Sequence, residues 1–170
     1  MAKYVFAFNP ELCIGCRACE IACKQHNDLP VGIKLRNVYT FESGKFPKPE
    51  LRFVTISCFH CSDPPCMKAC PMDAIFQRED GIVLVDESKC IGCGYCLYAC
   101  PFGAPTFKSS DALGSKGTMR KYTFCYDRID KGLKPACATV CITGALIAGS
   151  AEEVSRIKKE MAASKLANTL

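Results

Sequence analysis

The cysteines of this chain recur in groups whose spacing suits metal binding. The first group reads C-x-x-C-x-x-C-x-x-x-C in CIGCRACEIAC, and the third repeats that spacing in CIGCGYCLYAC. The second, CFHCSDPPCMKAC, has two extra residues in its middle, and the last, FCYDRIDKGLKPACATVC, keeps only three cysteines. Four copies of one pattern indicate an internal repeat. In order, the groups are Cys13, Cys16, Cys19 and Cys23; Cys58, Cys61, Cys66 and Cys70; Cys90, Cys93, Cys96 and Cys100; Cys125, Cys137 and Cys141.

The spacing favours iron–sulfur clusters. A four-iron cubane needs thiolates at four corners, and three cysteines in one tight loop can wrap one face of it. Gly15 and Gly92, each two positions after a cysteine, would let the backbone turn close to such a cluster. The fourth cysteine, expected one turn further on at the start of a short helix, would point away and ligate the other cluster of a pair, as in bacterial two-cluster ferredoxins.

Two other uses of cysteine fit less well. The chain has 15 cysteines in 170 residues, and this odd total leaves one unpaired in any disulfide scheme. No secretory signal is recognisable, so we expect a cytoplasmic protein, in which dense cysteines are metal ligands more often than disulfides. Zinc sites use two C-x-x-C pairs separated by a longer spacer than this chain has. His60 is expected to lie beside a cluster without ligating it, and His26 to be a solvated loop residue.

Composition excludes several other classes of protein. The apolar runs are far shorter than the roughly 20 residues of a membrane span. The formal net charge is +5, but the chain lacks interleaved aromatic residues and any nucleic-acid-binding motif, so a nucleic-acid partner is disfavoured. No phosphate-binding glycine loop or nucleophile with a neighbouring base indicates a catalytic site. A basic run is instead expected to offset the charge of the clusters: Lys116, Arg120, Lys121, Arg128, Lys131 and Lys134.

Three stretches carry a family resemblance: CIGCRACEIACK, CFHCSDPPCMKACP and FCYDRIDKGLKPAC. Through them, residues 3 to 150 resemble the four-cluster iron–sulfur subunits that serve molybdenum and tungsten pterin enzymes. Such subunits occur in the dimethyl-sulfoxide-reductase family and beside tungsten aldehyde oxidoreductases. The family has its first and last cysteine groups in one ferredoxin-like unit, and the middle groups in a second unit inserted within it.

The resemblance implies three [4Fe-4S] clusters and a fourth that differs from them. The implied ligands are Cys13, Cys16, Cys19 and Cys141 for cluster 1; Cys58, Cys61, Cys66 and Cys100 for cluster 2; Cys90, Cys93, Cys96 and Cys70 for cluster 3; and Cys125, Cys137 and Cys23 for cluster 4.

Tyr122 stands where the related subunits have the fourth ligand of cluster 4, three residues before Cys125. Phenol is a poor substitute for thiolate at iron. Three outcomes are open: a [3Fe-4S] cluster, a [4Fe-4S] cluster with a non-cysteine ligand, or no cluster. The odd ligand could be water or hydroxide, Tyr122 itself or Asp127. An empty site is disfavoured because it would leave three surplus thiols at ligand spacing.

The elements that must position these cysteines are short. We expect strands at 3–8, 36–43, 51–57, 81–86 and 144–150, and helices at 19–24, 66–69, 97–100 and 135–141. Residues 109–120, rich in Gly and Ser, predict a mobile connector. Ser150 is expected to cap a C-terminal amphipathic helix that packs on the protein's own surface or, as an alternative, on a partner.

The expected fold is therefore α+β. It has two interlocked bacterial-ferredoxin-like units, an outer one (1–50 and 108–150) and an inserted one (51–107), followed by a C-terminal helix and tail (151–170). The expected function is relay of single electrons between a molybdenum- or tungsten-pterin catalytic subunit and an acceptor such as a flavin or NAD subunit. Quinones, suggested by membrane-anchored relatives, are a weaker choice of acceptor. A free-standing polyferredoxin is the alternative, and no catalytic residue is predicted.

Overall fold

A computed structural model describes residues 4–107 and 117–167. Its strands form four two-stranded antiparallel sheets, β1–β8, β2–β3, β4–β5 and β6–β7. The elements are β1 (Tyr4–Phe8), α1 (Ala18–His26), β2 (Arg36–Lys45), β3 (Lys48–Ser57), α2 (Pro65–Lys68), β4 (Ile75–Gln77), β5 (Val83–Val85), α3 (Tyr95–Ala99), β6 (Thr106–Phe107), β7 (Met119–Arg120), α4 (Tyr126–Ile129), α5 (Ala136–Thr139), β8 (Leu146–Ser150) and α6 (Ala151–Ala167). The predicted α+β class with a C-terminal helix is confirmed.

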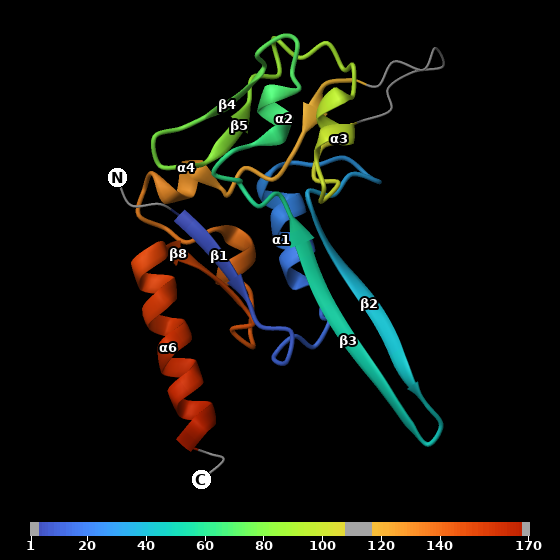
Figure 1. The fold of residues 1–170 in the computed structure, drawn as a ribbon, viewed down its shortest axis with the longest axis vertical. Coiled ribbons are helices and arrows are strands. Elements are labelled where there is room, and N and C mark those ends of the chain that lie inside the picture. The colour runs from blue at the N-terminus through green and yellow to red at the C-terminus, as the bar shows by residue number, and fades with distance from the viewer. Residues whose placement is uncertain (1–3, 108–116, 168–170) are drawn as a thin grey trace.

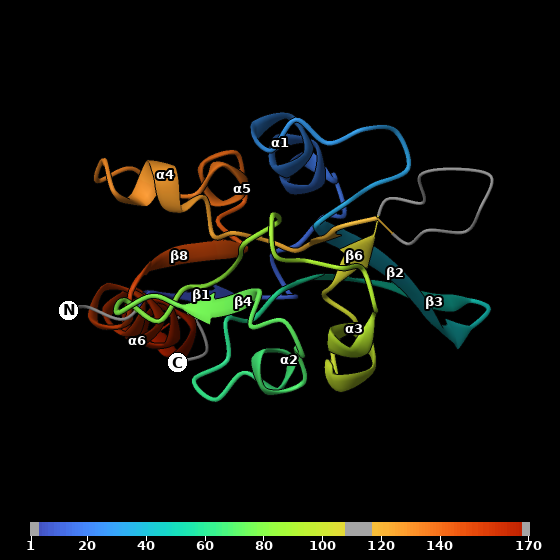
Figure 2. The same cartoon turned by 90° about the horizontal axis from the view of Figure 1, so that it is seen from above.

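The first and last strands of the chain pair with each other. Tyr4 lies opposite Ser150 and Phe8 opposite Leu146. Helix α5 packs on β8 and on α1, while α6 packs on β1 and β8. Seen from above, α1, α4 and α5 lie on one side of the β1–β8 ribbon, and α2 and α3 lie on the other (Figure 2). Segments from both ends of the chain therefore build one part of the molecule.

The middle segments build the opposite end of the molecule (Figure 1). Helices α2 and α3 pack together beside the β4–β5 ribbon. Thr106 and Phe107 pair with Arg120 and Met119, so that β6 and β7 join the chain on both sides of residues 108–116.

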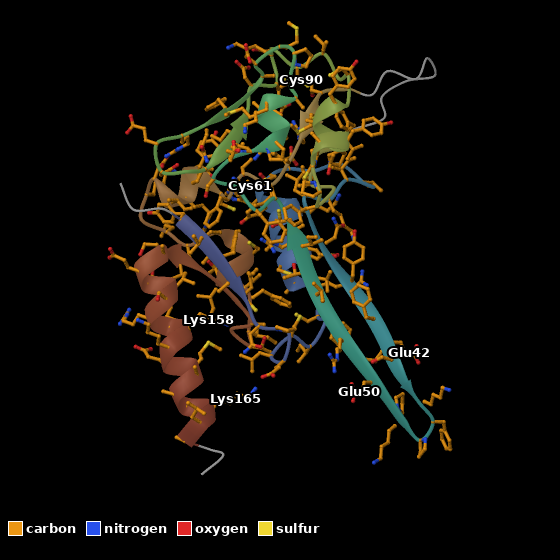
Figure 3. The ribbon with its side chains drawn as sticks, in the orientation of Figure 1. Glu42, Glu50, Cys61, Cys90, Lys158 and Lys165 are labelled. Atoms are coloured by element: carbon orange, nitrogen blue, oxygen red, sulfur yellow. The ribbon has the colours of Figure 1, made fainter. Side chains whose placement is uncertain are left out.

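A long hairpin of β2 and β3 projects from the body of the molecule (Figures 1 and 3). Each strand has 10 residues, and Arg36 pairs with Ser57 while Lys45 pairs with Lys48 at the tip. Beyond its base the hairpin is exposed on both faces. It spans the boundary expected between residues 50 and 51.

Helix α6 begins as the sequence predicts. The backbone N–H of Glu153 donates to Ser150 Oγ at 3.2 Å, which satisfies an N–H that the helix itself leaves free. Val154 is buried, and Ile157 and Met161 are half-buried toward the protein's own surface. Among the helices of the described residues, none is long and apolar enough to cross a membrane.

The five expected strands and four expected short helices are all present, with ends shifted by a few residues. Strands β4, β6 and β7 and helix α4 were not anticipated. Each has only two to four residues, too few for a hydrophobic pattern to mark it. Most of the predicted connector, 109–116, lies outside the described residues, but its last two residues form β7.

Aromatic side chains fill the core between β1 and the last cysteine group. The rings of Phe6 and Phe124 lie 4.2 Å apart between centroids, and Phe6 and Tyr122 lie 5.5 Å apart. Phe124 is 2% exposed and Tyr122 fully buried. The same apolar cluster contains Cys23, Cys58 and Cys137, so the aromatic core and the cysteines form one packed region.

Substitution of Phe124 should test this core. Phe124→Ala removes a buried ring, and we expect the loss of stability to be about 3–5 kcal/mol. The measurement is the temperature at which the anaerobically purified protein loses half its visible absorbance. Val31→Ala, in the loop after α1 and 98% exposed, is the control and should change stability by no more than about 0.5 kcal/mol. Equal shifts for the two variants would contradict the packing described.

Candidate metal centres

The four cysteine groups share one local geometry around a short helix. The third ligand position of each group, counting Tyr122 as the first position of the last group, is the second residue of its helix, in α1, α2, α3 and α5. The fourth cysteine follows four residues later, inside α1 or just beyond the end of the other helices. The prediction that the fourth cysteine starts the helix is therefore wrong, because each helix begins one residue before the third position. The pairs are Cys19 and Cys23, Cys66 and Cys70, Cys96 and Cys100, and Cys137 and Cys141.

The loop before each helix turns in the same way. Two residues after the first ligand position, the backbone has a positive φ in all four groups: 69° at Gly15, 48° at His60, 68° at Gly92 and 61° at Phe124. Non-glycine residues rarely adopt this conformation, so its recurrence at His60 and Phe124 indicates a specific backbone requirement. The fourth group keeps the turn although Tyr122 replaces the cysteine that would begin it.

The second group lines a cavity together with one cysteine of the third group. The lining of this cavity, called the Cys58 cavity below, includes Cys58, Cys61, Cys66 and Cys100. Around these thiols it is apolar, with Phe59, Phe102 and prolines, except for Lys121. The four thiols come from two segments of the chain, before and after the β4–β5 ribbon.

A second cavity is lined by three cysteines of the third group and one of the second. Its lining, that of the Cys90 cavity, includes Cys90, Cys93, Cys96 and Cys70. Two backbone N–H groups donate to sulfur here, Ala74 to Cys70 Sγ and Met119 to Cys90 Sγ, both at 3.3 Å. Figure 3 shows Cys61 near the middle of the molecule and Cys90 near the far end.

The thiols of the first and last groups meet where α1 packs on α5. Cys19 lies close enough to Cys137 and Cys141 for their charges to act on its pKa, which burial raises most. The backbone N–H of Leu146 donates to Cys141 Sγ at 3.4 Å. Cys13 and Cys16 lie in the loop before α1, where Cys13 is half-buried and Cys16 is exposed.

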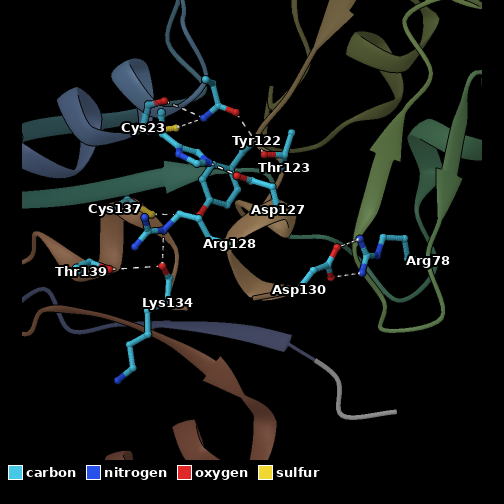
Figure 4. Close-up of polar contacts among 12 residues, drawn as sticks. Cys23, Arg78, Tyr122, Thr123, Asp127, Arg128, Asp130, Lys134, Cys137 and Thr139 are labelled. Atoms are coloured by element: carbon cyan, nitrogen blue, oxygen red, sulfur yellow. Dashed lines mark hydrogen bonds and ion pairs between the residues drawn. The ribbon is translucent and has the colours of Figure 1, made fainter. Parts of the chain in front are cut away.

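Cys23, Cys125 and Cys137 are almost completely buried, at 1%, 0% and 0% exposed. Burial raises the pKa of Cys23 to about 12 and that of Cys125 to about 11. Tyr122 Oη lies 3.1 Å from Cys137 Sγ, as Figure 4 shows. Burial raises the pKa of Tyr122 well above its ordinary value, so its phenol can donate a hydrogen bond to this sulfur.

Arg36 is a buried cation beside these thiols that the sequence analysis missed. Its guanidinium carbon lies 4.8 Å from the ring centroids of both Phe6 and Tyr122. Its Nη1 donates to Thr55 Oγ1 at 3.1 Å. In the part of the chain that the structure describes, its Nε and Nη2 have no hydrogen-bond partner. A buried guanidinium with two free donors needs negative charge nearby, and metal-bound thiolates would supply it.

The two histidines differ in their surroundings. His60 is 7% exposed, and its Nδ1 accepts from the backbone N–H of Val83 at 3.0 Å. Burial, and then the charge of Lys121, lower the pKa of His60 to about 2, so it is neutral. The prediction of a solvated loop for His26 is wrong: it is the last residue of α1, and its Nε2 lies 3.0 Å from Asp127 Oδ1. That contact engages Asp127, one of the suggested odd ligands.

The basic run is divided between buried and exposed positions. Lys121 reaches Cys58 Sγ at 3.5 Å. Arg120 and Lys134 instead form ion pairs at the surface with Glu87 and Glu153. Lys116 lies outside the described residues.

Repeated loops and short helices that gather thiols around apolar cavities define a ferredoxin-type iron–sulfur protein. Comparison with known families agrees. Residues 49–151 match the 4Fe-4S dicluster domain and residues 6–26 the 4Fe-4S binding domain.

Curated relatives cover nearly the whole chain. The formate dehydrogenase iron-sulfur subunit of Wolinella succinogenes is 44% identical, over 94% of this chain and 87% of the relative. One polypeptide of the anaerobic dimethyl sulfoxide reductase of Escherichia coli is 39% identical, over 95% of this chain and 80% of the relative. One polypeptide of the selenate reductase of Mesobacillus selenatarsenatis is 33% identical, over 95% of this chain and 65% of the relative.

The chain therefore belongs to the 4Fe-4S dicluster family and, within it, to the iron–sulfur subunits of dimethyl-sulfoxide-reductase type. The predicted resemblance is confirmed. The chain is a non-catalytic electron-transfer subunit of an oxidoreductase complex that carries [4Fe-4S] clusters.

Proposed function

We propose that this chain relays single electrons between a molybdenum- or tungsten-pterin catalytic subunit, of an aldehyde oxidoreductase or a similar enzyme, and an acceptor. The acceptor is a flavin or NAD subunit or a diffusible carrier. The observation that carries this proposal is the pair of cavities, each lined by four cysteines from two segments of one compact body. The relatives are named for formate, dimethyl sulfoxide and selenate, so the substrate is a property of the partner.

The proposed ligand sets are those that the family resemblance implies. The Cys58 cavity supports cluster 2, including Cys100, and the Cys90 cavity supports cluster 3, including Cys70. The meeting of Cys19 with Cys141 supports cluster 1. Each fourth cysteine would then serve the neighbouring cluster.

The residues around the thiols fit such a group. A cubane held at four corners by thiolates has no open position for a substrate, so it supplies one-electron transfer. The protein contributes apolar walls that exclude water and N–H groups that donate to sulfur, both of which tune the reduction potential. The unpartnered donors of Arg36 also fit a bound anion.

For the fourth site we propose a [3Fe-4S] cluster held by Cys23, Cys125 and Cys137. The loop keeps the positive φ at Phe124, so the backbone is still shaped as in the complete groups. Tyr122 fills the missing corner with a buried ring whose hydroxyl lies against Cys137 Sγ. An iron atom at that corner would lack a thiolate.

We also propose the division into an outer unit (1–50 and 108–150) and an inserted unit (51–107), and a cytoplasmic location. The pairing of β1 with β8 supports an outer unit built from both ends of the chain.

Exposed apolar side chains favour a subunit over a free-standing polyferredoxin. Tyr39, Phe41 and Val54 share one face of the hairpin and are 51%, 56% and 37% exposed. Phe46, next to the hairpin tip, is 95% exposed. Apolar surface gathered on a projecting two-stranded hairpin is typical of an interface with another polypeptide.

Anaerobic purification of the whole protein from its own cells tests the proposed function. We expect it to co-elute with a pterin-containing polypeptide, to absorb broadly in the visible range and to hold about fifteen iron atoms per chain. A brown protein that elutes alone would favour the polyferredoxin. A colourless protein that holds zinc would overturn both hypotheses.

The crossed wiring predicts paired effects of two matched substitutions. Cys70→Ser should damage the cluster held by Cys90, Cys93 and Cys96, and Cys100→Ser the one held by Cys58, Cys61 and Cys66. Each variant should lose at most about a quarter of the iron. Low-temperature paramagnetic resonance of the reduced protein identifies the lost signal. If each variant loses the signal of its own sequence group, the crossover is wrong.

Tyr122→Cys should complete the fourth site. A three-iron cluster is paramagnetic when oxidised, so the unsubstituted protein should give a signal in that state. In Tyr122→Cys this signal should disappear while iron rises by about one atom per chain. Tyr122→Phe is the control, in which the signal persists because the corner still lacks a thiolate. Absence of the oxidised signal from the unsubstituted protein would contradict the three-iron proposal.

A further inference from the structure

The Cys58 and Cys90 cavities have matching thiols but different charge. Each is lined by four cysteines and by mostly apolar side chains. Lys121 lines the Cys58 cavity, whereas none of the described residues that line the Cys90 cavity carries a charge. The buried cysteines of the two cavities are similarly exposed to solvent. Cys58 and Cys66 of the Cys58 cavity are 9% and 8% exposed, and Cys96 of the Cys90 cavity is 7% exposed.

Lys121 is held firmly in this position. It is 3% exposed, and its Nζ donates to Cys58 Sγ and to the carbonyl of Tyr122, both at 3.5 Å, as well as to the carbonyl of Val83. Within residues 4–107 and 117–167 it forms no ion pair with a carboxylate. The negative charge that it meets is therefore that of the cysteine sulfurs.

We propose that Lys121 raises the reduction potential of the cluster in the Cys58 cavity above that of the cluster in the Cys90 cavity. This inference rests on the proposed ligand sets. Reduction adds one negative charge to a cluster, and a buried cation beside a ligand sulfur stabilises the reduced form more than the oxidised one. Because the site excludes water, screening of this interaction is weak. An electron that enters this pair of sites therefore rests in the Cys58 cavity.

Backbone hydrogen bonds to sulfur also raise the reduction potential of a cluster. Those in the Cys90 cavity therefore oppose the effect of Lys121 on the order of the two potentials, but more weakly. The Cys90 cavity has the N–H groups of Ala74 and Met119 at 3.3 Å from sulfur. In the Cys58 cavity the N–H of His60 lies 3.5 Å from Cys58 Sγ, and backbone hydrogen bonds also reach Cys61 and Cys66. A peptide N–H carries a partial charge, and the ammonium of Lys121 a full one. Burial lowers the pKa of Lys121, whereas the charges of Cys58, Cys66 and Cys100 raise it and favour the ammonium form. The lysine therefore decides the order of the two potentials.

Redox titration of the whole complex, followed by paramagnetic resonance, tests the proposal. In Lys121→Met, one cluster should show a reduced-to-oxidised ratio at least tenfold lower at a given ambient potential, which for one electron is about 59 mV. Arg120→Met is the matched control. It removes the same charge from the adjacent residue, whose side chain is 40% exposed and paired with Glu87, and it should leave every cluster within a factor of two.

Two further variants assign the signals. The signal altered in Cys61→Ser belongs to the Cys58 cavity and that altered in Cys93→Ser to the Cys90 cavity. In the unsubstituted protein, the former should appear at the higher potential, and this order decides the matter even if Lys121→Met loses iron. The reverse order, or equal shifts in Lys121→Met and Arg120→Met, would overturn the proposal. A protein without clusters at these cysteines would instead overturn the proposed function.

Discussion

Four residues separate the third and fourth ligand positions of every cysteine group, and the architecture depends on that spacing. In α1 both cysteines lie on the helix, where four residues rise about 6 Å, whereas α2, α3 and α5 end before the fourth cysteine. If one serves its own loop, the other is left for a neighbouring site, and the groups must then be arranged in pairs. The packing of α2 on α3 and of α1 on α5 provides these pairs. The second pair joins the first and last cysteine groups, which is why β1 and β8 meet.

Burial of the thiols makes the protein's stability depend on its metal. The pKa values of Cys23, Cys125 and Cys96, raised to about 12, 11 and 11 mainly by burial, keep these thiols protonated at neutral pH until a metal displaces the proton. The buried cations Arg36 and Lys121 gain full compensation only when the thiols are ionised. Neither charge is tolerable in a core without such compensation. Metal binding, thiol ionisation and neutralisation of the two cations are therefore one coupled event.

Cysteine spacing predicted the family, and local residue patterns predicted the short helices and most strands, because each of these features is local. Ser150 likewise marked the start of α6 through the local cap that it forms. What escaped prediction is either only two to four residues long or set by tertiary contacts. Lys121 and Arg120 are adjacent and equally basic, yet one is buried at a sulfur and the other pairs with Glu87 at the surface. Arg120 is paired with Thr106 in the β6–β7 ribbon, and Lys121 follows directly after the strand, so only the tertiary structure distinguishes them.

The short segment from Lys121 to Cys125 joins the two halves of the site. Lys121 faces the Cys58 cavity, Tyr122 stacks against Arg36 and reaches Cys137, and Cys125 lies among the buried thiols of the fourth group. Cys58, Tyr122 and Cys137 belong to one apolar cluster, so these regions are joined by continuous packing. On the proposed ligand sets, Tyr122 would change the chemistry of one corner of the fourth site while its buried ring preserves the packing. The same five residues would then set the properties of that site and supply the cation beside Cys58.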